Sequence, residues 1–495
     1  MNKKPNIIYI LADDMGYGDI SCLNEKSKIK TDNLDKLAGE GILFRDAHSS
    51  SAVCTPSRYS ILTGRYNWRS RLKSSVLMGH SDHLIEDGRT TIASFLKPHG
   101  YNSAMIGKWH LGWDWTTTDG EPVLADCSNI DFNGSVSNGP DACGFDYYYG
   151  HIASLDIPPY VYVENGKITA APDRVTESNT QFGWWRKGST GSDFVHQDVL
   201  PNFTQRSVNY IEQQAKEDNP FFLYFPLPAP HTPILPSEQF IGKSGTNIYG
   251  DFCLQVDDVV GQIMDAVELS GIADNTIILF TADNGCSPAA DVNGLEAMGH
   301  NPSYIYRGYK ADIYEGGHRI PLIVRWPDTI AAGSSSDETV CLSDMLATCA
   351  DIVGASLADR EGEDSVSNLP LWKGKLLDKS LREATVHHSI DGSFSIRKGN
   401  WKLEMCAGSG GWSYPKPGAE CEGLPDIQLY NLDSDVAEQN NVYDKFPKVV
   451  EDLKTLLTKY VVDGRSTPGE KQANVDGISW EQLWWILSNE QSSLE

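Results

Sequence analysis

The stretch Asn6-Ile7-Ile8-Tyr9-Ile10-Leu11-Ala12-Asp13-Asp14 decides the fold class of this chain. From Ile7 to Ala12 it is a continuous apolar run that is rich in β-branched side chains. A run without polar alternation is typical of a strand that is buried on both faces of a parallel sheet. The two aspartates that follow place carboxylates at the point where this strand ends.

Further strands and helices alternate along the first 350 residues or so. Short apolar runs predict strands, and apolar positions at helical spacing predict the helices between them. This alternation indicates an α/β layer fold, with a large central, mostly parallel sheet sandwiched by helices. In chain order, the segments are helix 31–40, helix 90–96, strand 101–106, helix 197–214, strand 221–225, helix 251–269, strand 276–281 and strand 321–325.

The polar stretch 358–367 marks a boundary, and a second unit follows it. There we predict a small α+β unit with an antiparallel sheet. The irregular segment 111–200 interrupts the first unit, and an excursion of this length in a compact domain is usually functional. We therefore predict an α/β domain over 1–375, with 111–200 as an insertion that shapes the substrate site, and a C-terminal α+β subdomain over 376–495. Its segments are strands 384–388, 394–398, 401–405 and 428–432, helix 447–460, and a tail whose Trp480, Trp484 and Trp485 we expect to dock onto the body.

The composition excludes two classes of protein. The 495 residues include 41 Lys and Arg against 67 Asp and Glu, a formal net charge of −26, whereas a nucleic-acid-binding protein needs a basic surface to displace counterions. No apolar run approaches the roughly 20 residues that a membrane-spanning helix needs. The first residues lead directly into the apolar run at Ile7, so we read them as the approach to a strand and not as a signal peptide. We expect a periplasmic or secreted protein whose signal peptide is absent from this sequence, or else a cytoplasmic one.

Ten cysteines are present, and none forms a CxxC pair, which argues against zinc ribbons and thioredoxin-like sites. Cys341 and Cys349 fall in one predicted helix, too far apart along its axis to bridge. Two other pairs lie in Gly-rich, loop-like surroundings where a disulfide can form, and their state is left open: Cys127 with Cys143, and Cys406 with Cys421.

The stretch Cys54-Thr55-Pro56-Ser57-Arg58 predicts the start of a short helix. Thr55 can cap this helix, Pro56 fits its first position, and Gly64 can end it. Cys54 then lies at the positive end of the helix beside Arg58, which is a natural place for an anion and for an activated nucleophile. A buried structural cysteine next to an arginine is the alternative that this stretch alone leaves open.

Polar residues follow four of the predicted apolar strands, namely 6–12, 101–106, 221–225 and 276–281. If the strands are parallel, these residues meet at the carboxyl edge of the sheet, where open α/β sheets bind ligands. The oxygen-bearing ones among them select a hard cation, calcium in preference to magnesium, and disfavour zinc. Without a cation the carboxylates would repel one another, although Asp13 and Asp283 can alternatively cap the helices that follow. The candidate cation ligands are Asp13, Asp14, Asp283 and Asn284.

Positive side chains accompany this set. A cation together with Arg58, Lys108 and Lys310 makes a pocket for a tetrahedral oxyanion ester. A histidine near the leaving oxygen, His110 or His231, can act as its general acid.

In combination, these motifs resemble the formylglycine-dependent type I sulfatases of the alkaline phosphatase superfamily. The CxPSR pattern followed by Leu62-Thr63-Gly64-Arg65 is highly specific, and no catalytic position departs from the family pattern. The matches occur in family order over roughly positions 6 to 330. They are Leu11-Ala12-Asp13-Asp14-Met15-Gly16, Cys54-Thr55-Pro56-Ser57-Arg58, Gly107-Lys108-Trp109-His110-Leu111-Gly112, Pro230-His231-Thr232-Pro233, Asp283-Asn284-Gly285, and Lys310 ahead of Glu315-Gly316-Gly317.

The resemblance implies an alkaline phosphatase-like fold and hydrolysis of sulfuric esters. It implies that a maturation enzyme oxidises Cys54 to formylglycine, whose hydrated gem-diol attacks sulfur while His231 protonates the departing alcohol. His110 would then act as base while the sulfated diol collapses to aldehyde and sulfate. Arg58 would hold the formylglycine, and the remaining roles would be sulfate binding by Lys108 and Lys310 and calcium binding by Asp13, Asp14, Asp283, Asn284 and residue 54.

The physical chemistry agrees with this implied mechanism. A thiol is a poor partner for a hard cation, whereas a diol oxygen suits it. The diol also lets the covalent intermediate break by C–O cleavage, so water need not attack sulfur again. Cys54 is therefore better read as the precursor of an oxygen nucleophile than as a thiol nucleophile.

Two other classes of protein are alternatives. A phosphoester hydrolase of the same superfamily usually carries a serine or threonine nucleophile and a two-metal site with additional histidines, whereas here Asn284 follows Asp283 and the nucleophile position is Cys54. A glycan-binding pseudoenzyme, or a chain never matured at Cys54, is the non-enzymatic alternative. The presence of all the catalytic residues argues against it.

The organic part of the substrate is the least determined feature. Bacterial relatives of this kind mostly desulfate carbohydrates, so the resemblance implies a sulfated oligo- or polysaccharide. Chondroitin or dermatan N-acetylgalactosamine sulfate is the first expectation, and marine sulfated galactan or fucan is the second. We expect contacts from the insertion, from 66–73 and from the loop at 298–301, although the basic candidates are equally suited to be solvated surface charges. The candidate contacts are Arg69, Arg71, Lys73, His83, Trp113 and His300.

Overall fold

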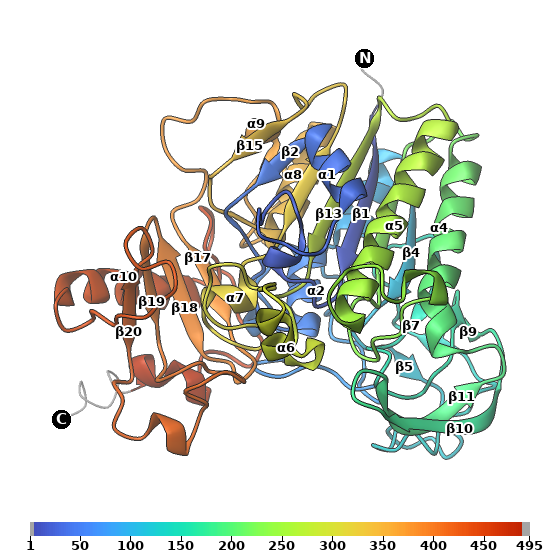
Figure 1. Cartoon of the computed structure of the whole chain (residues 1–495), viewed down its shortest axis with the longest axis horizontal. Helices are drawn as coiled ribbons and strands as arrows, with labels where there is room; N and C mark the ends of the chain where they lie inside the picture. Colours follow the sequence, from blue (N-terminus) through green and yellow to red (C-terminus); the bar gives the residue numbers. More distant parts are fainter. Residues whose placement is uncertain (1–3, 488–495) are drawn as a thin grey trace.

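A ten-stranded sheet forms the centre of the computed structural model, which describes residues 4–487 (Figure 1). Its order is β15-β2-β14-β13-β1-β12-β4-β7-β8-β9. The five strands from β13 to β7 are parallel to their neighbours, and antiparallel pairings flank this block on both sides. The strands are β1 (Asn6–Ala12), β2 (Ile42–Phe44), β4 (Asn102–Lys108), β7 (Tyr147–His151), β8 (Val163–Glu164), β9 (Lys167–Ile168), β12 (Phe221–Pro226), β13 (Thr276–Ala282), β14 (Leu322–Arg325) and β15 (Ser334–Ser336).

The predicted parallel sheet is confirmed in its central strands. Every residue of β1 is buried, and the strand pairs with β12 on one side and β13 on the other. Ile8, for example, lies opposite Leu223 and Ile278. Burial on both faces explains why the sequence of β1 shows no polar alternation.

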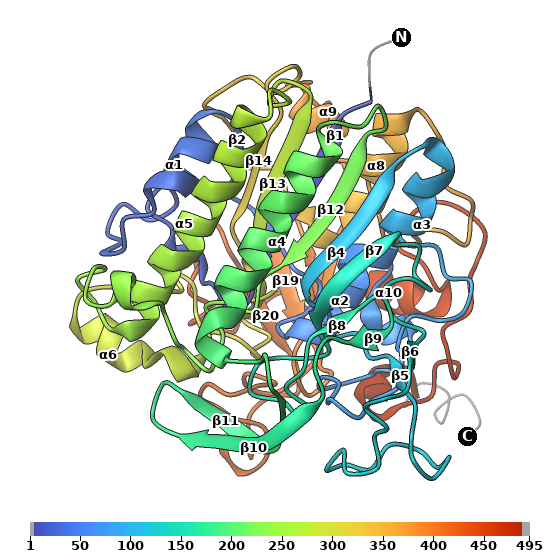
Figure 2. The same cartoon turned by 90° about the vertical axis from the view of Figure 1, so that its right-hand side faces the viewer.

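Helices cover both faces of the sheet (Figure 2). α1, α4 and α5 pack together on one face, and α2, α3 and α8 pack together on the other. The helices are α1 (Asp32–Gly39), α2 (Cys54–Thr63), α3 (Ile92–Leu96), α4 (Val199–Gln214), α5 (Ile248–Leu269), α6 (Val292–Ala297), α7 (Glu315–His318), α8 (Met345–Val353), α9 (Leu369–Trp372) and α10 (Pro447–Val462).

The segment 111–200 is more ordered than its composition suggests. Its aromatic run at Tyr147 forms β7, which adds a parallel strand to the central sheet beside β4. A long hairpin, β10 (Pro172–Asn179) with β11 (Trp184–Gly191), projects from the lower side of the molecule in Figure 2. A short antiparallel pair completes the segment: β5 (Asp114–Trp115) with β6 (Val136–Ser137).

The C-terminal unit is an antiparallel sheet of four strands with α10 packed against it, as predicted. Its hydrophobic core includes Tyr66 and Trp68 from the α/β part, and the tail residue Trp485 is buried in the same cluster. A further small sheet in the α/β part pairs β3 (Ala47–His48) with β16 (Val340–Cys341). The strands of the C-terminal sheet are β17 (Thr385–His388), β18 (Phe394–Lys398), β19 (Trp401–Glu404) and β20 (Gln428–Asn431).

The polar stretch 358–367 is not an exposed linker. Glu363 and Asp364 are buried within it, and they form ion pairs with Arg65 and Arg69 respectively. Both ion pairs lie within the α/β part, and their arginines also reach the C-terminal unit by donating to the carbonyls of Ala473 and Tyr460. The division into 1–375 and 376–495 stays a prediction.

The cysteine predictions need correction at one position. Cys341 lies in β16 and not in a helix, because α8 begins only at Met345. Within residues 4–487, which contain all ten cysteines, each one is a free thiol, including the two pairs considered for disulfides.

No helix within residues 4–487 is long and apolar enough to cross a membrane. The residues Met1 to Lys3, which we read as the approach to a strand, lie outside the described range.

Candidate functional site

The polar ends of four adjacent parallel strands meet at one edge of the sheet. Asp13 follows β1, Asp283 follows β13, Lys108 ends β4, and His231 lies in the loop after β12. The backbone ties these ends together, because the Asp13 amide donates to the Ala229 carbonyl at 2.9 Å and the Asp283 amide donates to the Ala12 carbonyl at 3.1 Å. The carboxyl-edge site expected of an open α/β sheet is therefore present.

A glycine permits this close approach beside Lys108. Gly107 has a φ of 138°, and a Cβ at this position would lie 2.0 Å from the carbonyl oxygen of Pro226. Only a residue without a side chain fits such a contact in this backbone conformation. Gly107 therefore lets the end of β4 lie against β12 and brings Lys108 to the neighbouring carboxylates.

α2 presents Cys54 to this edge, although its start differs from the prediction. The helix begins at Cys54 itself, and its N-cap is Val53, which makes no side-chain cap bond. Thr55 does not cap; its hydroxyl accepts a hydrogen bond from the Leu77 amide at 3.2 Å. Gly64 ends the helix in the left-handed conformation, as predicted.

Cys54 is a buried, neutral thiol in this setting. Its Sγ lies 3.5 Å from Oδ1 of Asp13. Burial raises the pKa of the thiol far above its ordinary value, and this effect outweighs the opposing charges of Lys108 and Lys310. An unmodified Cys54 is therefore not a thiolate near neutral pH, which disfavours a thiol nucleophile.

Three buried ion pairs surround Cys54. Lys108 Nζ lies 2.5 Å from Asp13 Oδ2. Arg58 Nη2 lies 2.7 Å from Asp283 Oδ2, and Arg58 Nη1 also donates to the Lys108 carbonyl at 3.0 Å. The third pair joins Lys310 Nζ to Asp14 Oδ1 at 2.7 Å. These six residues are at most 5% exposed.

The pairs divide their charge unevenly. Burial acts to raise the pKa of Asp13, but the charges of Lys108, His231 and Arg58 outweigh it and hold that pKa well below its usual range. Burial and the nearby Asp13 carboxylate instead raise the pKa of Asp283 to about 6. The surroundings therefore stabilise the ionised form of Asp13 and destabilise the ionised form of Asp283.

These residues fit a hard cation. Asn284 donates Nδ2 to Asp14 Oδ1 at 2.8 Å, and its own Oδ1 is buried without a hydrogen-bond partner in the described part of the chain. One ligand atom each from Asp13, Asp14, Cys54 and His231 lies within 4.8 Å of the others. Three carboxylates balance three cationic side chains, so a divalent ion would give the pocket a net positive charge suited to an anionic ester.

His231 and His110 lie beside this cluster, and the available ring nitrogen is Nε2 in His231 and Nδ1 in His110. His231 Nδ1 lies 2.5 Å from the Thr232 carbonyl, so this nitrogen is the donor, and Nε2 faces Asp14 Oδ2 at 3.6 Å. His110 Nε2 donates to the Leu77 carbonyl at 2.9 Å, while its buried Nδ1 has no partner among residues 4–487. Burial, followed by the charges of Lys108 and Arg58, holds the pKa of His110 well below its ordinary value, so it is a neutral imidazole with a free lone pair.

A supporting network behind Asp14 was not predicted. The Tyr249 hydroxyl lies within hydrogen-bonding distance of two acceptors, 3.1 Å from the Asp14 carbonyl oxygen and 2.5 Å from Asp19 Oδ2. Asp19 accepts from the Gly16 amide at 2.7 Å and pairs with His300 Nε2 at 2.8 Å. His300, expected to contact substrate, is fully buried and instead holds this loop. Asp19 is close to the Asp13-Asp14 pair in the sequence, but two of its partners, Tyr249 and His300, come from distant segments.

Three more candidate substrate contacts are committed to other interactions. Arg69 is fully buried and pairs with both carboxylate oxygens of Asp364 at 2.8 Å. Lys73 donates to three carbonyls, those of Trp68, Ser70 and Val475. Trp113 is 1% exposed and packs against Trp115 and Tyr148. These side chains join or fill the fold and do not face a ligand.

Arg71 and His83 are more open. Arg71 is exposed, and its guanidinium donates to the carbonyls of Asp82 and His83. The His83 side chain is 29% exposed and lies 3.0 Å from Asp114. Both residues belong to the segment that leads to and from Leu77, the residue that contacts Thr55 and His110.

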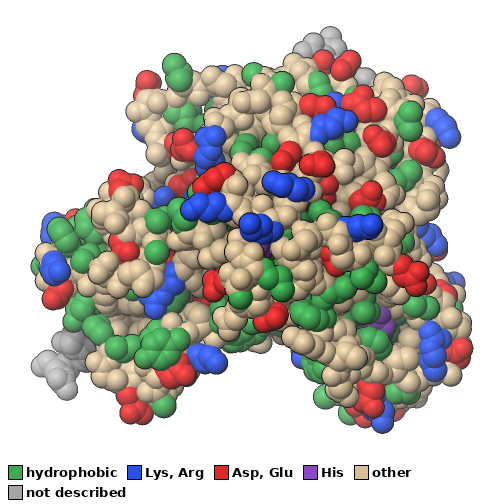
Figure 3. All heavy atoms as spheres, viewed as in Figure 1, with side chains coloured by type: hydrophobic (Ala, Val, Ile, Leu, Met, Phe, Trp, Pro, Cys, Tyr) green, Lys and Arg blue, Asp and Glu red, His purple; other side chains and the backbone are tan. Residues whose placement is uncertain are grey.

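Two lobes of the molecule flank a broad notch on the side toward which the carboxyl ends of the parallel strands point (Figure 1 and Figure 3). In the space-filling view the C-terminal unit and the insertion project on either side of a broad notch at the lower edge (Figure 3). The strands of the central sheet run toward this side (Figure 1). The C-terminal unit reaches the catalytic loops directly, because the amides of Ala52 and Ile390 donate to the carbonyls of His388 and Ala311 at 2.8 and 3.0 Å.

Comparisons with known proteins agree with this geometry. The Sulfatase family model matches residues 5–355. An N-acetylgalactosamine-6-O-sulfatase from Bacteroides thetaiotaomicron is 33% identical over 92% of this chain and 93% of its own length. An N-acetylgalactosamine-6-sulfatase from Mus musculus is 30% identical over 85% of this chain and 76% of its own length.

A solved structure supports the same conclusion. It is described as part of glycosaminoglycan metabolism by Bacteroides thetaiotaomicron, and it superposes with a TM-score of 0.80 at 32% identity. The match covers 92% of this chain and 99% of that one. The family model, the relatives and the assembled sheet-edge site together show that this chain belongs to the sulfatase family and is a sulfuric ester hydrolase.

Proposed function

We propose that this sulfatase removes the 6-O-sulfate of N-acetylgalactosamine in a chondroitin- or dermatan-type glycosaminoglycan. The observation that carries the proposal is the buried pocket of three carboxylates and three cationic side chains around Cys54. The sugar and the sulfate position are taken from relatives that align over most of the chain, whose names specify N-acetylgalactosamine-6-sulfate.

The pocket fits two groups that the family uses. A calcium ion would be held by Asp13, Asp14, Asp283, Asn284 and residue 54, and when bound it would supply positive charge to the ester oxygens. A maturation enzyme would convert Cys54 to formylglycine, which would supply an oxygen nucleophile at a position where the thiol is uncharged.

The chain's own residues then have distinct tasks. Lys108 and Lys310 would bind the sulfate oxygens, because the Nζ atoms of both lie within the buried cluster. Arg58 would hold residue 54 in place through its contacts with Asp283 and the Lys108 carbonyl.

The two histidines would move protons at opposite ends of the reaction. At 9% exposure His231 is the most open member of the proposed catalytic set, so its Nε2 is placed to give a proton to the departing sugar oxygen. The unpartnered Nδ1 of His110 would accept a proton during release of the sulfate.

Arg71 and His83 are the proposed sugar contacts. Of the candidate contacts named from the sequence, they retain the most exposure beside the segment that carries Leu77. A polymeric sulfated substrate is encountered outside the cytoplasm, so we also propose that the protein acts in the periplasm or is secreted.

Defined saccharides test the proposal. Sulfate release would be measured by ion chromatography from chondroitin disaccharides sulfated at the 6- or the 4-position, with 4-nitrophenyl phosphate and a sulfated galactan in parallel. We expect the 6-sulfated disaccharide to be preferred at least tenfold, and Cys54→Ala to abolish turnover. Preference for the galactan or the phosphate ester would refute the proposed substrate. Binding of sulfated glycans without turnover by a matured protein would indicate a pseudoenzyme.

The maturation of Cys54 has its own test. Peptide mass spectrometry of protein purified from its native host should show the Cys54 peptide lightened by the difference between a thiol and an aldehyde. An unmodified cysteine in an active preparation would refute the formylglycine part of the proposal while leaving the substrate result standing.

A further inference from the structure

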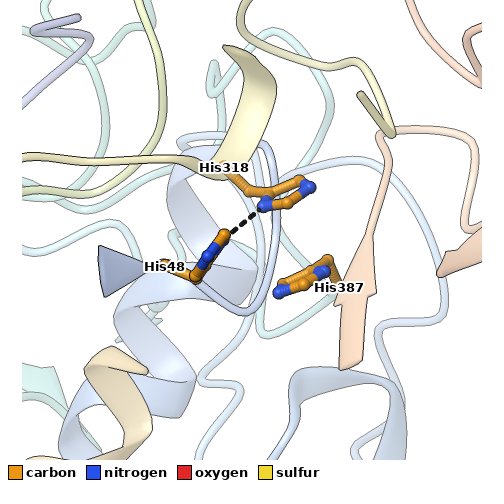
Figure 4. A group of neighbouring side chains, drawn as sticks. All are labelled: His48, His318 and His387. Atoms are coloured by element: carbon orange, nitrogen blue, oxygen red, sulfur yellow. Dashed lines mark hydrogen bonds between the residues drawn. The ribbon is translucent and has the colours of Figure 1, made fainter. Parts of the chain in front are cut away.

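Three buried histidines meet where the α/β part contacts the C-terminal unit (Figure 4). His48 comes from β3, His318 from α7 and His387 from β17, and all three are fully buried. The Nδ1 atoms of His48 and His318 are 3.0 Å apart. The rings of His318 and His387 stack with centroids 3.8 Å apart, and one nitrogen from each histidine lies within 4.8 Å of the others.

Each histidine also has an outward partner for its other nitrogen. His48 Nε2 lies 2.8 Å from Asp46 Oδ1, and His318 Nε2 lies 3.1 Å from the Ile313 carbonyl. His387 Nδ1 lies 3.1 Å from Ser395 Oγ. Histidines that bind metals almost always donate their second N–H to a carboxylate, a carbonyl or a similar group, which fixes the tautomer.

One nitrogen at the centre of the cluster is unsatisfied. His387 Nε2 is buried and has no hydrogen-bond partner in the described residues. A buried polar atom without a partner loses its hydrogen bonds to water and gains none in the protein, which costs free energy. If Nδ1 donates to Ser395, this Nε2 carries a lone pair, which is the form that binds a cation.

The imidazoles are neutral, as ligands must be. Burial is the largest cause that lowers the pKa of all three rings, to about 4 for His48 and well below the usual range for the other two. Arg397 and Lys402 approach only the outward Nε2 atoms of His48 and His318, at 2.9 and 3.1 Å. Both cations already pair with carboxylates, those of Asp46 and Glu438.

We propose that His48, His318 and His387 form a structural site for a borderline transition cation, with Zn²⁺ as its occupant. The 3.0 Å between the two Nδ1 atoms is close to the roughly 3.3 Å that separates two nitrogens about 2.0–2.1 Å from a tetrahedral zinc. A small movement of the His387 ring brings Nε2 into the third position. Three nitrogens disfavour Ca²⁺ and Mg²⁺, so this site is chemically separate from the oxygen-rich pocket around Asp13.

Proton balance fixes the tautomers of the two rings. In the metal-free state two neutral rings whose Nδ1 atoms lie 3.0 Å apart place one N–H between them, so one ring carries its proton on Nδ1 and the other carries it on Nε2. When an ion binds both Nδ1 atoms, the proton between them moves to Nε2 of its own ring, where Asp46 or the Ile313 carbonyl accepts it. Binding of the ion therefore releases no proton near neutral pH.

The ion would link two parts of the chain. His48 and His318 belong to the α/β part, whereas His387 belongs to the first strand of the C-terminal sheet. A ligand set shared between units favours their association and raises stability according to the concentration of free metal.

The test compares His387→Phe with a matched surface control, His99→Phe. Phenylalanine keeps a ring stacked on His318 but removes the ligand, and His99 is only partly buried beside Phe95. Full-length protein would be dialysed against a chelator, returned to excess Ca²⁺, and titrated with Zn²⁺ and Co²⁺, with a Cys54→Ala variant in parallel. Co²⁺ absorption reports the coordination geometry, and a pH indicator counts released protons.

We expect one Zn²⁺ per chain, no proton released near neutral pH, and a tetrahedral Co²⁺ spectrum that survives Cys54→Ala and His99→Phe. His387→Phe should weaken binding at least 100-fold, and Ser395→Ala should weaken it about 10–100-fold because the ring loses its orientation. Zn²⁺ binding that is absent, unaffected by His387→Phe, or abolished by Cys54→Ala would overturn the proposal.

Discussion

The proposed general acid, His231, can be tested by making its proton unnecessary. The change is His231→Asn, and the comparison is between the 6-sulfated disaccharide and 4-nitrophenyl sulfate. A sugar alkoxide leaves poorly unless it is protonated, whereas nitrophenolate leaves readily as an anion. Loss of the acid should therefore affect the two substrates unequally.

The structure sets the size of the effect. His231 Nδ1 is held by the Thr232 carbonyl, so Nε2 is the nitrogen available to the substrate. General acid catalysis of this kind contributes about 10²–10⁴ in rate, or about 3–5 kcal/mol of activation free energy. The charge that His231 lends to neighbours such as Asp13 affects both substrates alike. We expect kcat/KM to fall by about 10²–10⁴ for the disaccharide and by less than about tenfold for the aryl ester.

The assay measures kcat/KM for both substrates by sulfate release, with nitrophenolate absorbance as a second readout. His99→Asn, on the surface, is the control for handling and expression. Equal losses on the two substrates would refute the assignment, because they would show that His231 positions groups or supplies charge without donating the proton. Normal turnover of the disaccharide would refute it as well.

Three other changes probe separate parts of the molecule. Lys310→Ala should lower kcat/KM for sulfate esters by about 10²–10³, because one buried donor to the oxyanion is lost, and Lys310→Arg should not restore it; steady-state kinetics with both variants checks this. Arg69→Met should lower the free energy of unfolding by about 3–5 kcal/mol in urea denaturation, because Asp364 is left buried without its cationic partner, and adding Asp364→Asn should recover part of the loss because the neutral amide oxygen still accepts from one of the Tyr66 and Ser466 amides; a single variant as stable as the parent would contradict this. Burial lowers the pKa of His196 to about 3 from its ordinary value near 6.5, so the unfolded chain binds the proton first and stability falls as pH falls through this window. Between pH 7 and pH 5 this residue should cost about 2 kcal/mol, and His196→Gln should show a correspondingly smaller decrease in urea midpoint.

The meeting of the candidate site residues at one sheet edge was predictable because its determinants are local. A buried strand that is followed by polar residues fixes where those residues lie, once the strand is parallel to its neighbours. Asp13, Lys108, His231 and Asp283 each follow such a strand, and β13, β1, β12 and β4 are adjacent in the sheet. Four local signals therefore produced one three-dimensional site.

Residues whose role depends on distant partners were not predictable in this way. Arg69 looked like a surface charge near the nucleophile, but Asp364 lies 295 positions away and buries it. His300 is likewise held by Asp19, 281 positions earlier. The Cys54 helix begins two residues earlier than predicted, and the hydroxyl of Thr55, the expected cap, instead accepts a hydrogen bond from the Leu77 amide. In each case a long-range contact decided between two locally acceptable structures.

The contrast between local and overall charge explains how an acidic protein can hydrolyse an anionic sulfate ester. The chain carries a net charge of −26, which repels an anion at long range. At the site, three cationic side chains cancel three carboxylates within a nearly solvent-free cluster. The charge of a divalent ion held there would not be cancelled by these residues, and the low dielectric around it would strengthen the attraction of the pocket for a sulfate oxygen at short range. Attraction for the substrate would therefore be confined to the sulfate group that enters the site.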